Sequence, residues 1–168
     1  VVYHSHIFEL IPKQHTVKFQ KEVIRVLKPG GIQRIVIPDM EILCSELINH
    51  LAICDENEEE CKKHENYIDN IIGQCVQEHS IGTKRQIKLQ SALETLLLGS
   101  AKKRGQTHQW MYDRVNLKQL LKKCGFENIR TVGYNVSHIK NWNDYALDLN
   151  NDKTAYKKRS LYMECTKV

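Results

Sequence analysis

The sequence has no apolar run long enough to cross a bilayer and no strong excess of charge of either sign. A transmembrane helix needs about 20 consecutive apolar residues, so we expect no membrane span, and no signal-peptide pattern is present. The formal net charge is +5, and the basic clusters at 102–104 and 157–159 are short. Solvated surface accounts for such clusters without nucleic acid. We therefore expect neither a membrane nor a nucleic acid as partner.

A disulfide framework is also lacking, because the six cysteines follow no regular spacing. A chain of 168 residues can bury a core of its own without disulfides. Its content of 41% hydrophobic and 27% charged residues is ordinary for a globular domain. We therefore expect a single domain spanning residues 1–168, in the reducing environment of the cytoplasm.

The first 39 residues are predicted to form a strand, a helix, a glycine turn and a second strand. Val1–Tyr3 favours β structure, and a helix is expected to begin near Pro12. Its predicted buried face carries Phe19, Val23, Val26 and Leu27. The Gly30-Gly31 pair permits a turn with positive φ, and the apolar run Ile32–Ile37 suits a central strand. Strand, helix and strand in one unit predict parallel strands in an α/β sheet.

Residues from about 40 to 105 are predicted to form a helical insert. Apolar residues recur at helical spacing in three stretches. The first contains Ile42, Leu43, Leu47, Ile48 and Leu51, the second runs from Tyr67 to Val76, and the third from Leu89 to Leu97. The acidic run at 55–60 is expected to be a solvated loop before the second helix.

The C-terminal third is predicted to contain one more helix and two strands. Asn116 and Gln119 have the spacing of a capping box, and Gly125 is expected to end the helix. The predicted strands are Phe126–Val132 and Leu161–Thr166. The polar stretch between them is expected to be irregular, and its predicted anchors against the sheet are Trp142 and Tyr145.

Two pairs of Cys and His in the insert raise the question of a metal site. Cys61 and His64 lie three residues apart and Cys75 and His79 four apart, so each pair would share a helix face. Two such pairs supply the four ligands of a tetrahedral zinc ion. Cys75, however, continues an aliphatic stripe and is better explained as a small core residue. We therefore expect no metal.

Three segments near the N-terminus carry a family resemblance: HSHIFE at 4–9, RVLKPGG at 25–31 and IVIPD at 35–39. Together they resemble the second half of a class I S-adenosylmethionine-dependent methyltransferase domain. HQWMYD at 108–113 and SLYMEC at 160–165 narrow the likeness to type 11-like methyltransferases associated with surface-polysaccharide genes. The family often has His where this chain has Leu10, so no role is carried over to that position.

The resemblance implies a partial Rossmann-like α/β fold. Its mixed sheet would contain strands equivalent to the family's fourth, fifth, seventh and sixth, in that order. The first three strands, which carry the Gly-rich turn of the cofactor site, are expected to be absent, and the sequence contains no Gly-x-Gly-x-Gly. In this family the interval 40–105 commonly forms a lid over the substrate. A plain helical insert packed on the sheet is the alternative.

The resemblance also implies S-adenosyl-L-methionine as cofactor. Ligands of open parallel sheets bind at the carboxyl ends of the strands. The residues expected to border the cofactor there are His4, Ser5, His6 and Glu9.

Proton transfer from a hydroxyl acceptor requires a base, and the candidate catalytic residues are His6, Asp39 and His108. The alternatives are that Asp39 caps the following helix and that His108 forms a hydrogen bond within the lid. Trp110 and Tyr112 are candidates for stacking on a sugar ring, although aromatic residues in a loop more often attach it to the core.

Two functions stay open at this point. The first is a methyltransferase acting on a small-molecule or saccharide acceptor. The second is a non-enzymatic, methyltransferase-like module for binding or assembly. In either case the strand at Val1–Tyr3 would lie at a sheet edge, and exposed edges favour pairing with another chain. We therefore expect a homodimer that forms through this edge.

Overall fold

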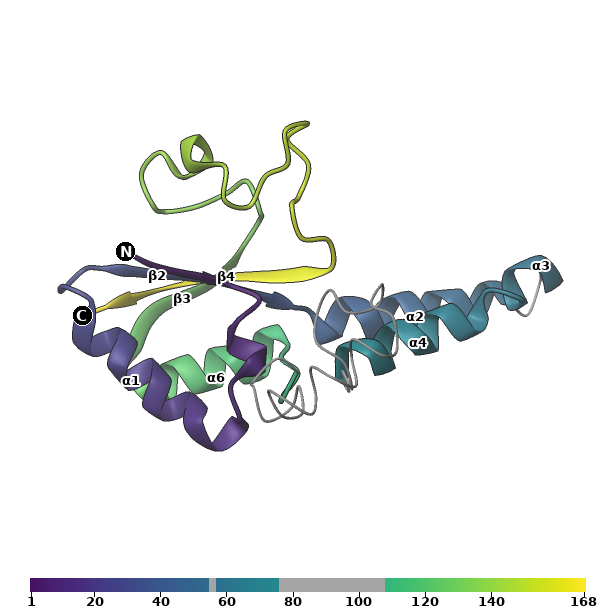
Figure 1. Ribbon diagram of the computed structural model, residues 1–168, viewed down its shortest axis with the longest axis horizontal. Helices are drawn as coiled ribbons and strands as arrows, with labels where there is room; N and C mark the ends of the chain where they lie inside the picture. The colour runs from purple at the N-terminus through teal and green to yellow at the C-terminus, as the bar shows by residue number, and fades with distance from the viewer. Residues whose placement is uncertain (55–56, 76–107) are drawn as a thin grey trace, which may run out of the picture.

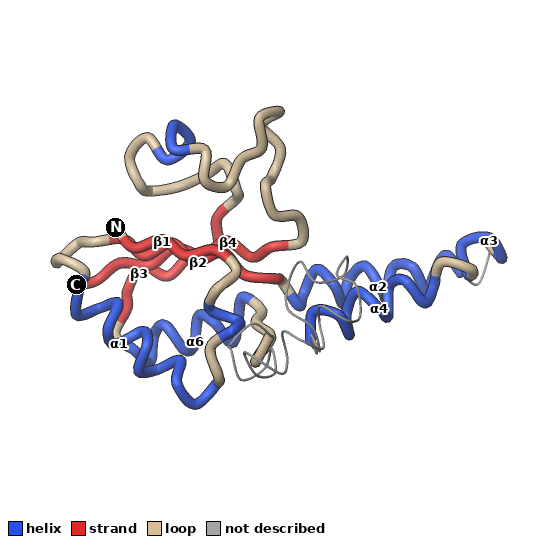
Figure 2. Tube along the Cα trace, viewed as in Figure 1, coloured by secondary structure: helices blue, strands red, loops and turns tan. Residues whose placement is uncertain are grey.

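The computed structural model describes residues 1–54, 57–75 and 108–168, which contain a four-stranded mixed sheet. The strands are β1 (Val2–Ser5), β2 (Ile32–Pro38), β3 (Phe126–Val132) and β4 (Ser160–Lys167). Their order in the sheet is β1-β2-β4-β3 (Figures 1 and 2). β1 and β2 are parallel, whereas β4 is antiparallel to both of its neighbours. The chain is therefore α/β, and the last strand lies between the second and third, as predicted.

Helices cover one face of this sheet. α1 (Thr16–Val26) and α6 (Arg114–Cys124) lie side by side below it in Figure 1, and the segment 133–159 crosses the opposite face. α2 (Met40–Cys54) and α4 (His64–Cys75) form a hairpin that extends away from the sheet, with α3 (Glu58–Cys61) at its tip. The short 3-10 helices are Phe8–Leu10, Lys13–His15 and Trp142–Tyr145. In the described part of the chain, no helix is long and apolar enough to cross a membrane.

The β1-α1-β2 unit forms as the sequence predicts, with two errors in the helix. α1 begins at Thr16, after the 3-10 helix Lys13–His15, and not near Pro12. Val23 and Leu27 are buried, but Val26 is 58% exposed. The helix ends at Val26, and the extended backbone of Leu27 directs that residue into the core instead. Gly30 has a φ of +71°, and its N–H donates to Lys167 O at 2.8 Å. The glycine turn therefore joins α1 to β2 and pairs with the end of β4.

The start of α6 differs from the prediction. The N-cap is Asp113, not Asn116. The Asp113 carboxylate accepts hydrogen bonds from the backbone N–H groups of Val115 and Asn116, and Asn116 Oδ1 accepts from Asp113 N. The capping box is thus Asp113 with Asn116, one helical turn earlier than expected. Gly125 ends the helix in the left-handed conformation, as predicted.

The helical hairpin corrects two further expectations. Part of the acidic run is helical, because Asn57 Oδ1 accepts from the N–H groups of Glu59 and Glu60 and so starts α3. The first apolar stripe is not a buried face throughout: Leu43 is buried, but Ile48 and Leu51 are 66% and 47% exposed. The third predicted stripe, Leu89–Leu97, lies outside the described residues.

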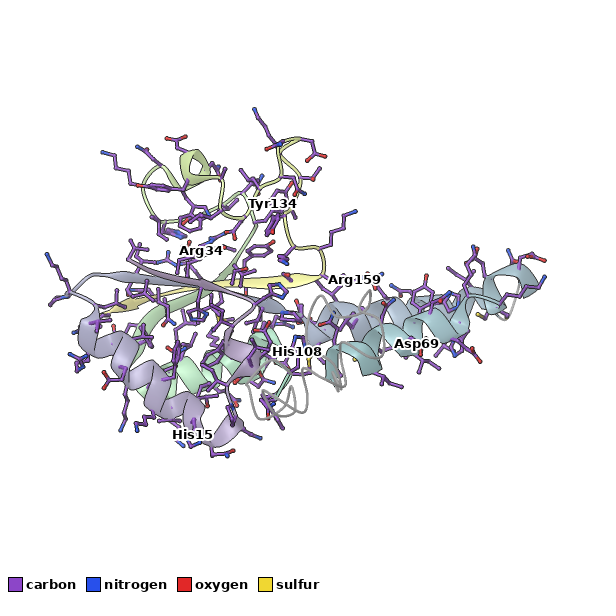
Figure 3. All side chains as sticks on the ribbon, viewed as in Figure 1. His15, Arg34, Asp69, His108, Tyr134 and Arg159 are labelled. Atoms are coloured by element: carbon purple, nitrogen blue, oxygen red, sulfur yellow. The ribbon has the colours of Figure 1, made fainter. Side chains whose placement is uncertain are left out.

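The segment 133–159 is attached to the sheet by Arg34, whose side chain is completely buried. Its Nε donates to Asp148 Oδ2 at 2.8 Å, and its Nη1 donates to Glu164 Oε1 at 2.7 Å. The remaining N–H groups donate to the backbone oxygens of Gly133, Tyr134 and Val136. Figure 3 shows Arg34 beneath this segment, with Tyr134 above it. All five guanidinium donors therefore have acceptors.

Two aromatic residues were predicted to anchor this segment, and one does. Trp142 is buried, donates from Nε1 to Asp148 Oδ2 at 3.0 Å, and lies 4.9 Å from the Arg34 guanidinium. Tyr145 is 62% exposed, so its prediction as an anchor is wrong. Besides Trp142, the polar contacts of Arg34 and Asp148 attach the segment 133–159 to the sheet.

Replacing Arg34 with Leu is expected to lower the free energy of unfolding by about 3–5 kcal/mol, because two buried carboxylates lose their cation. Equilibrium unfolding in urea measures this change. The matched control is Arg25→Gln, which removes an exposed ion pair with Glu22 and should cost less than about 1 kcal/mol. Equal effects of the two substitutions would contradict the anchoring role of Arg34.

Candidate functional site

A cavity of about 650 Å³ lies at the carboxyl ends of β1 and β2. Its wall combines the sheet edge, the α2–α4 hairpin and the residues that precede β4. Lining residues include His6, Pro38, Leu43, Gln74, Lys158 and Arg159. Because β4 is antiparallel, its first residues meet the last residues of the parallel strands at this edge. This is the edge at which open α/β sheets bind ligands.

Two non-glycine residues at this edge adopt positive φ angles. His6 has a φ of 52° and Arg159 a φ of 55°. Such conformations cost free energy and persist where the surrounding structure holds them. His6 N donates to Val36 O at 2.8 Å, and Asp39 N donates to Arg159 O at 3.0 Å. Neighbouring strand ends therefore hold both strained residues beside the cavity.

The chemical centre of the site is the buried carboxyl group of Glu9, which is 1% exposed. Its Oε1 lies 3.4 Å from His6 Nδ1 and 4.0 Å from His108 Nε2. Neither carboxyl oxygen has a hydrogen-bond partner among the described residues. His6 Nε2 lies 3.0 Å from Ser160 Oγ. Glu9 thus connects two imidazoles, and its oxygens remain able to accept a polar ligand group.

The tautomer of His108 follows from its hydrogen bond. Its Nδ1 lies 2.6 Å from the carbonyl oxygen of Gln74, and a carbonyl oxygen only accepts. Nδ1 therefore carries the proton, and Nε2 presents a lone pair toward Glu9. His108 bridges the hairpin and the Glu9 segment, close to where the hairpin meets the sheet in Figure 3.

Burial controls the protonation of this cluster. It raises the pKa of Glu9 to about 7 and lowers the pKa of His6 to about 4, to which nearby Lys157 also contributes. Burial lowers the pKa of His108 too, against the effect of its bond to Gln74. Both imidazoles are therefore neutral near pH 7, and Glu9 exchanges its proton in that range. A group that titrates near neutral pH, as Glu9 does, suits general acid–base chemistry.

Two of the four predicted cofactor residues, His6 and Glu9, lie in this cluster. Ser5 is partly exposed at the end of β1. His4 points to the opposite face of the strand from Ser5 and packs in the core. It lies 2.9 Å from the Gln33 amide nitrogen, and its ring is within 6 Å of Phe8 and Phe19. The structure does not bring His4 to the cavity.

The other candidates divide between structural and exposed positions. Asp39 Oδ1 accepts from Glu41 N at 2.9 Å, so this carboxylate caps α2, as in the alternative interpretation. Burial raises the pKa of Asp39. Tyr112 is buried with its ring 5.0 Å from Phe8, so it attaches its loop to the core. Trp110 is 39% exposed and lies under the Lys13 ammonium at 3.5 Å.

The sequence did not reveal that residues 157–160 belong to this site. By sequence, Lys158 and Arg159 belong to a predicted solvated cluster, and Ser160 lies between that cluster and the predicted strand Leu161–Thr166. The sequence feature that indicates their place in the site is that these residues directly precede an antiparallel strand. Such a strand starts at the edge of the sheet where β1 and β2 end. Arg159 reaches α2 from there, with Nε 2.8 Å from Glu46 Oε2.

Comparisons of the chain with protein-family models, with curated proteins and with solved structures gave no match. A functional proposal therefore rests on the geometry of the site and on the motif resemblance.

Replacing Glu9 with Gln should change how stability depends on pH. The folded pKa of Glu9 is about 7 against a usual 4.5, so between these values the folded state holds a proton that the unfolded chain has released. The contribution of Glu9 to the free energy of unfolding then falls as pH rises. The stability advantage of Glu9→Gln over the wild type should grow between pH 4.5 and 7, by on the order of 3 kcal/mol.

Urea unfolding at several pH values measures this difference. Glu22→Gln, at an exposed carboxylate, serves as the control and should give a difference that hardly changes with pH. A flat difference for Glu9→Gln as well would show that the Glu9 carboxyl is not destabilised by burial.

Proposed function

We propose that this chain is part of an S-adenosylmethionine-dependent methyltransferase domain with a partial Rossmann-like fold. It would act in the cytoplasm on a hydroxyl of a small-molecule or saccharide acceptor. The observation that supports this best is the buried Glu9 carboxyl between His6 and His108, beside a cavity at the ligand-binding edge of the sheet. No described residue forms a hydrogen bond with its oxygens. The antiparallel β4 between β2 and β3 agrees with the strand order that the motif resemblance implies.

The residues at this edge fit one part of the cofactor. S-adenosylmethionine carries a sulfonium and an ammonium group, and the unpartnered oxygens of Glu9 are acceptors for a cationic group. His6 and Glu9 would hold that portion, with Ser5 next to them. Because the sequence contains no Gly-x-Gly-x-Gly turn, these residues supply one wall of a pocket. When bound, the cofactor supplies a methyl group already activated for displacement.

The role of the cluster in this proposal is to remove a proton. The acceptor oxygen forms a bond to the methyl carbon while the bond from that carbon to sulfur breaks, so the hydroxyl proton must leave. His6 takes it on Nε2 when the acceptor hydroxyl takes the place of Ser160 Oγ beside that nitrogen. Glu9, 3.4 Å from Nδ1, stabilises the imidazolium that forms. The His108 ring, with Nε2 4.0 Å from Glu9 Oε1, lies on the opposite side of the carboxyl group.

The cytoplasmic location in this proposal agrees with the state of the described cysteines. Those at 44, 61, 124 and 165 take part in no disulfide among the described residues. Free thiols persist in the cytosol, whereas oxidising compartments favour disulfides.

Calorimetric titration of this chain with S-adenosylmethionine tests the cofactor proposal. We expect measurable binding that Glu9→Gln weakens by about tenfold or more, because a charge-assisted contact is lost. His15→Gln, at an exposed imidazole, should bind like the wild type. Absence of binding to the wild type would rule out cofactor binding by this chain alone.

Methyl transfer from labelled cofactor to hydroxyl acceptors tests the base. His6→Gln should lower the rate by roughly 10²–10⁴-fold, as for the loss of a general base, a larger effect than the one it has on cofactor affinity. An unchanged rate would contradict the role of His6 but leave cofactor binding standing.

A second candidate function is a non-enzymatic module for binding or assembly. The observation that favours it is the position of β1, which lies at the edge of the described sheet and pairs only with β2. An open strand edge is a template for pairing with a second chain. A homodimer formed through β1 is compatible with either function.

Sedimentation equilibrium tests this edge. If β1 pairs with its copy, Val1→Lys should weaken dimerisation by about tenfold or more, because a charge at the start of the edge strand, on the exposed residue before β1, opposes pairing. Val115→Lys makes the same change at an exposed position of α6 and should leave the dimer intact. A wild-type chain that stays monomeric at all concentrations would contradict assembly through this edge.

A further inference from the structure

A cluster of two histidines and a cysteine lies in the helical hairpin, among residues that do not line the cavity. His50 and Cys54 are on α2, and His64 is the first residue of α4. The potential ligand atoms of these three residues all lie within 4.8 Å of one another. His50 is 3% exposed, although it belongs to a hairpin that projects away from the sheet in Figure 1.

The spacing within the cluster suits a tetrahedral metal ion. Cys54 Sγ lies 3.2 Å from His50 Nε2. Zinc bonds of about 2.0 Å to nitrogen and 2.3 Å to sulfur place tetrahedral ligand atoms about 3.3–3.8 Å apart, and a nitrogen and a sulfur about 3.5 Å apart. The His50 and Cys54 side chains are four residues apart on one helix and so share a face. This pair is therefore already close to the separation of two ligands on one ion.

The third potential ligand is the Nδ1 atom of His64. This nitrogen is buried and has no hydrogen-bond partner among the described residues. Buried polar atoms in folded proteins are almost always paired, so the position calls for a partner that the described residues do not supply. The ring of His64 stacks on that of His50 at 5.5 Å, and the ring of His50 stacks on Tyr67 at 4.0 Å. These contacts hold both imidazoles in place across the two helices.

We propose that His50, Cys54 and His64 bind a zinc ion, with Cys61 as the fourth ligand. Cys61 is exposed, and its thiol donates to Cys54 O at 3.0 Å, which places it next to the cluster. Rotation of its side chain brings a second sulfur to the ion. The ligands then occur as His-x3-Cys-x6-Cys-x2-His within fifteen residues of sequence. Two thiolates balance the charge of a divalent ion, and imidazole with thiolate selects zinc over magnesium or calcium.

A zinc site in the hairpin differs from the sequence-based expectation of no metal. The sequence pairs Cys61 and His64 with Cys75 and His79, but His79 and the side chain of Cys75 lie outside the described part of the structure. The partners that the fold supplies for Cys61 and His64 are instead His50 and Cys54. An antiparallel helical hairpin brings the end of α2 to the start of α4.

The site would have a structural role in positioning the hairpin. Four protein ligands leave no open position for a substrate. Zinc joins α2, α3 and α4 at the far end of the hairpin. The near end supplies Glu46 and Gln74 to the cavity wall, and Gln74 O accepts from His108. Zinc binding should therefore stabilise the hairpin whether or not the chain transfers methyl groups.

Cobalt titration of metal-free, reduced protein tests the proposal directly. We expect one Co²⁺ per chain, with a thiolate-to-cobalt charge-transfer band that zinc abolishes by displacement. Cys54→Ser and His64→Gln should each weaken metal binding by more than about 100-fold, beyond the cost of an outer-shell residue. Cys61→Ser should reduce the charge-transfer intensity to about half, as expected for one thiolate in place of two. Zinc should also raise the melting temperature of the wild type.

Two controls separate this site from its alternatives. Cys44→Ser lies on the same helix outside the cluster and should bind cobalt like the wild type. Cys75→Ser tests the other pairing suggested by the sequence and should also leave binding unchanged. Metal binding lost in Cys75→Ser but kept in Cys54→Ser would overturn the assignment. Absence of a charge-transfer band in the wild type would show that the cluster is a hydrogen-bonded packing contact without metal.

Discussion

The buried guanidinium of Arg34 is the interaction on which one whole face of this protein depends. The other face of the sheet is covered by α1 and α6, but here the covering segment, residues 133–159, has little regular structure. A segment of this kind must find acceptors and donors for its backbone without a helical or sheet ladder. Arg34 donates to three of its carbonyl groups and to the carboxylates of Asp148 and Glu164. One side chain from the central strand thereby fixes the path of the segment over the sheet.

That path also shapes the candidate site. The segment ends in Lys158 and Arg159, which line the cavity. The next residue, Ser160 at the start of β4, contacts His6. The contact between segment and sheet at Arg34 therefore determines where the basic residues stand relative to Glu9. The Glu9 carboxyl is buried and has no hydrogen-bond partner in the described part of the chain, and such a group is costly to keep ionised. The Glu9 carboxyl lies between two neutral imidazoles, next to the strained backbone of His6. Strained backbone and shifted pKa values occur together at sites of ligand binding and proton transfer.

Local sequence patterns predict the structure correctly where neighbouring residues decide it. The apolar run of β2, the glycine turn and the Gly125 stop depend on propensities within a few residues, and all three formed as predicted. Errors occurred where two local solutions compete. Asn116 is a good N-cap by type, yet Asp113 caps α6 because it starts one turn earlier and uses Asn116 as its reciprocal partner. Val26 fits the helical period but is exposed, since α1 ends there and Leu27 turns inward.

The sequence by itself determined the α/β class, the order in which strands and helices follow one another, and the concentration of His6 and Glu9 at a strand end. These properties follow from periodicity and turn chemistry, which act over short distances along the chain. Only the tertiary structure decided that Arg34 meets a carboxylate 114 residues away, that His108 faces Glu9, and that His50 and Cys54 lie beside His64. Each of these contacts joins segments whose separation in sequence carries no signal of proximity. They form because the sheet order and the helical hairpin bring strand ends and helix ends together, and burial then requires their polar groups to find partners.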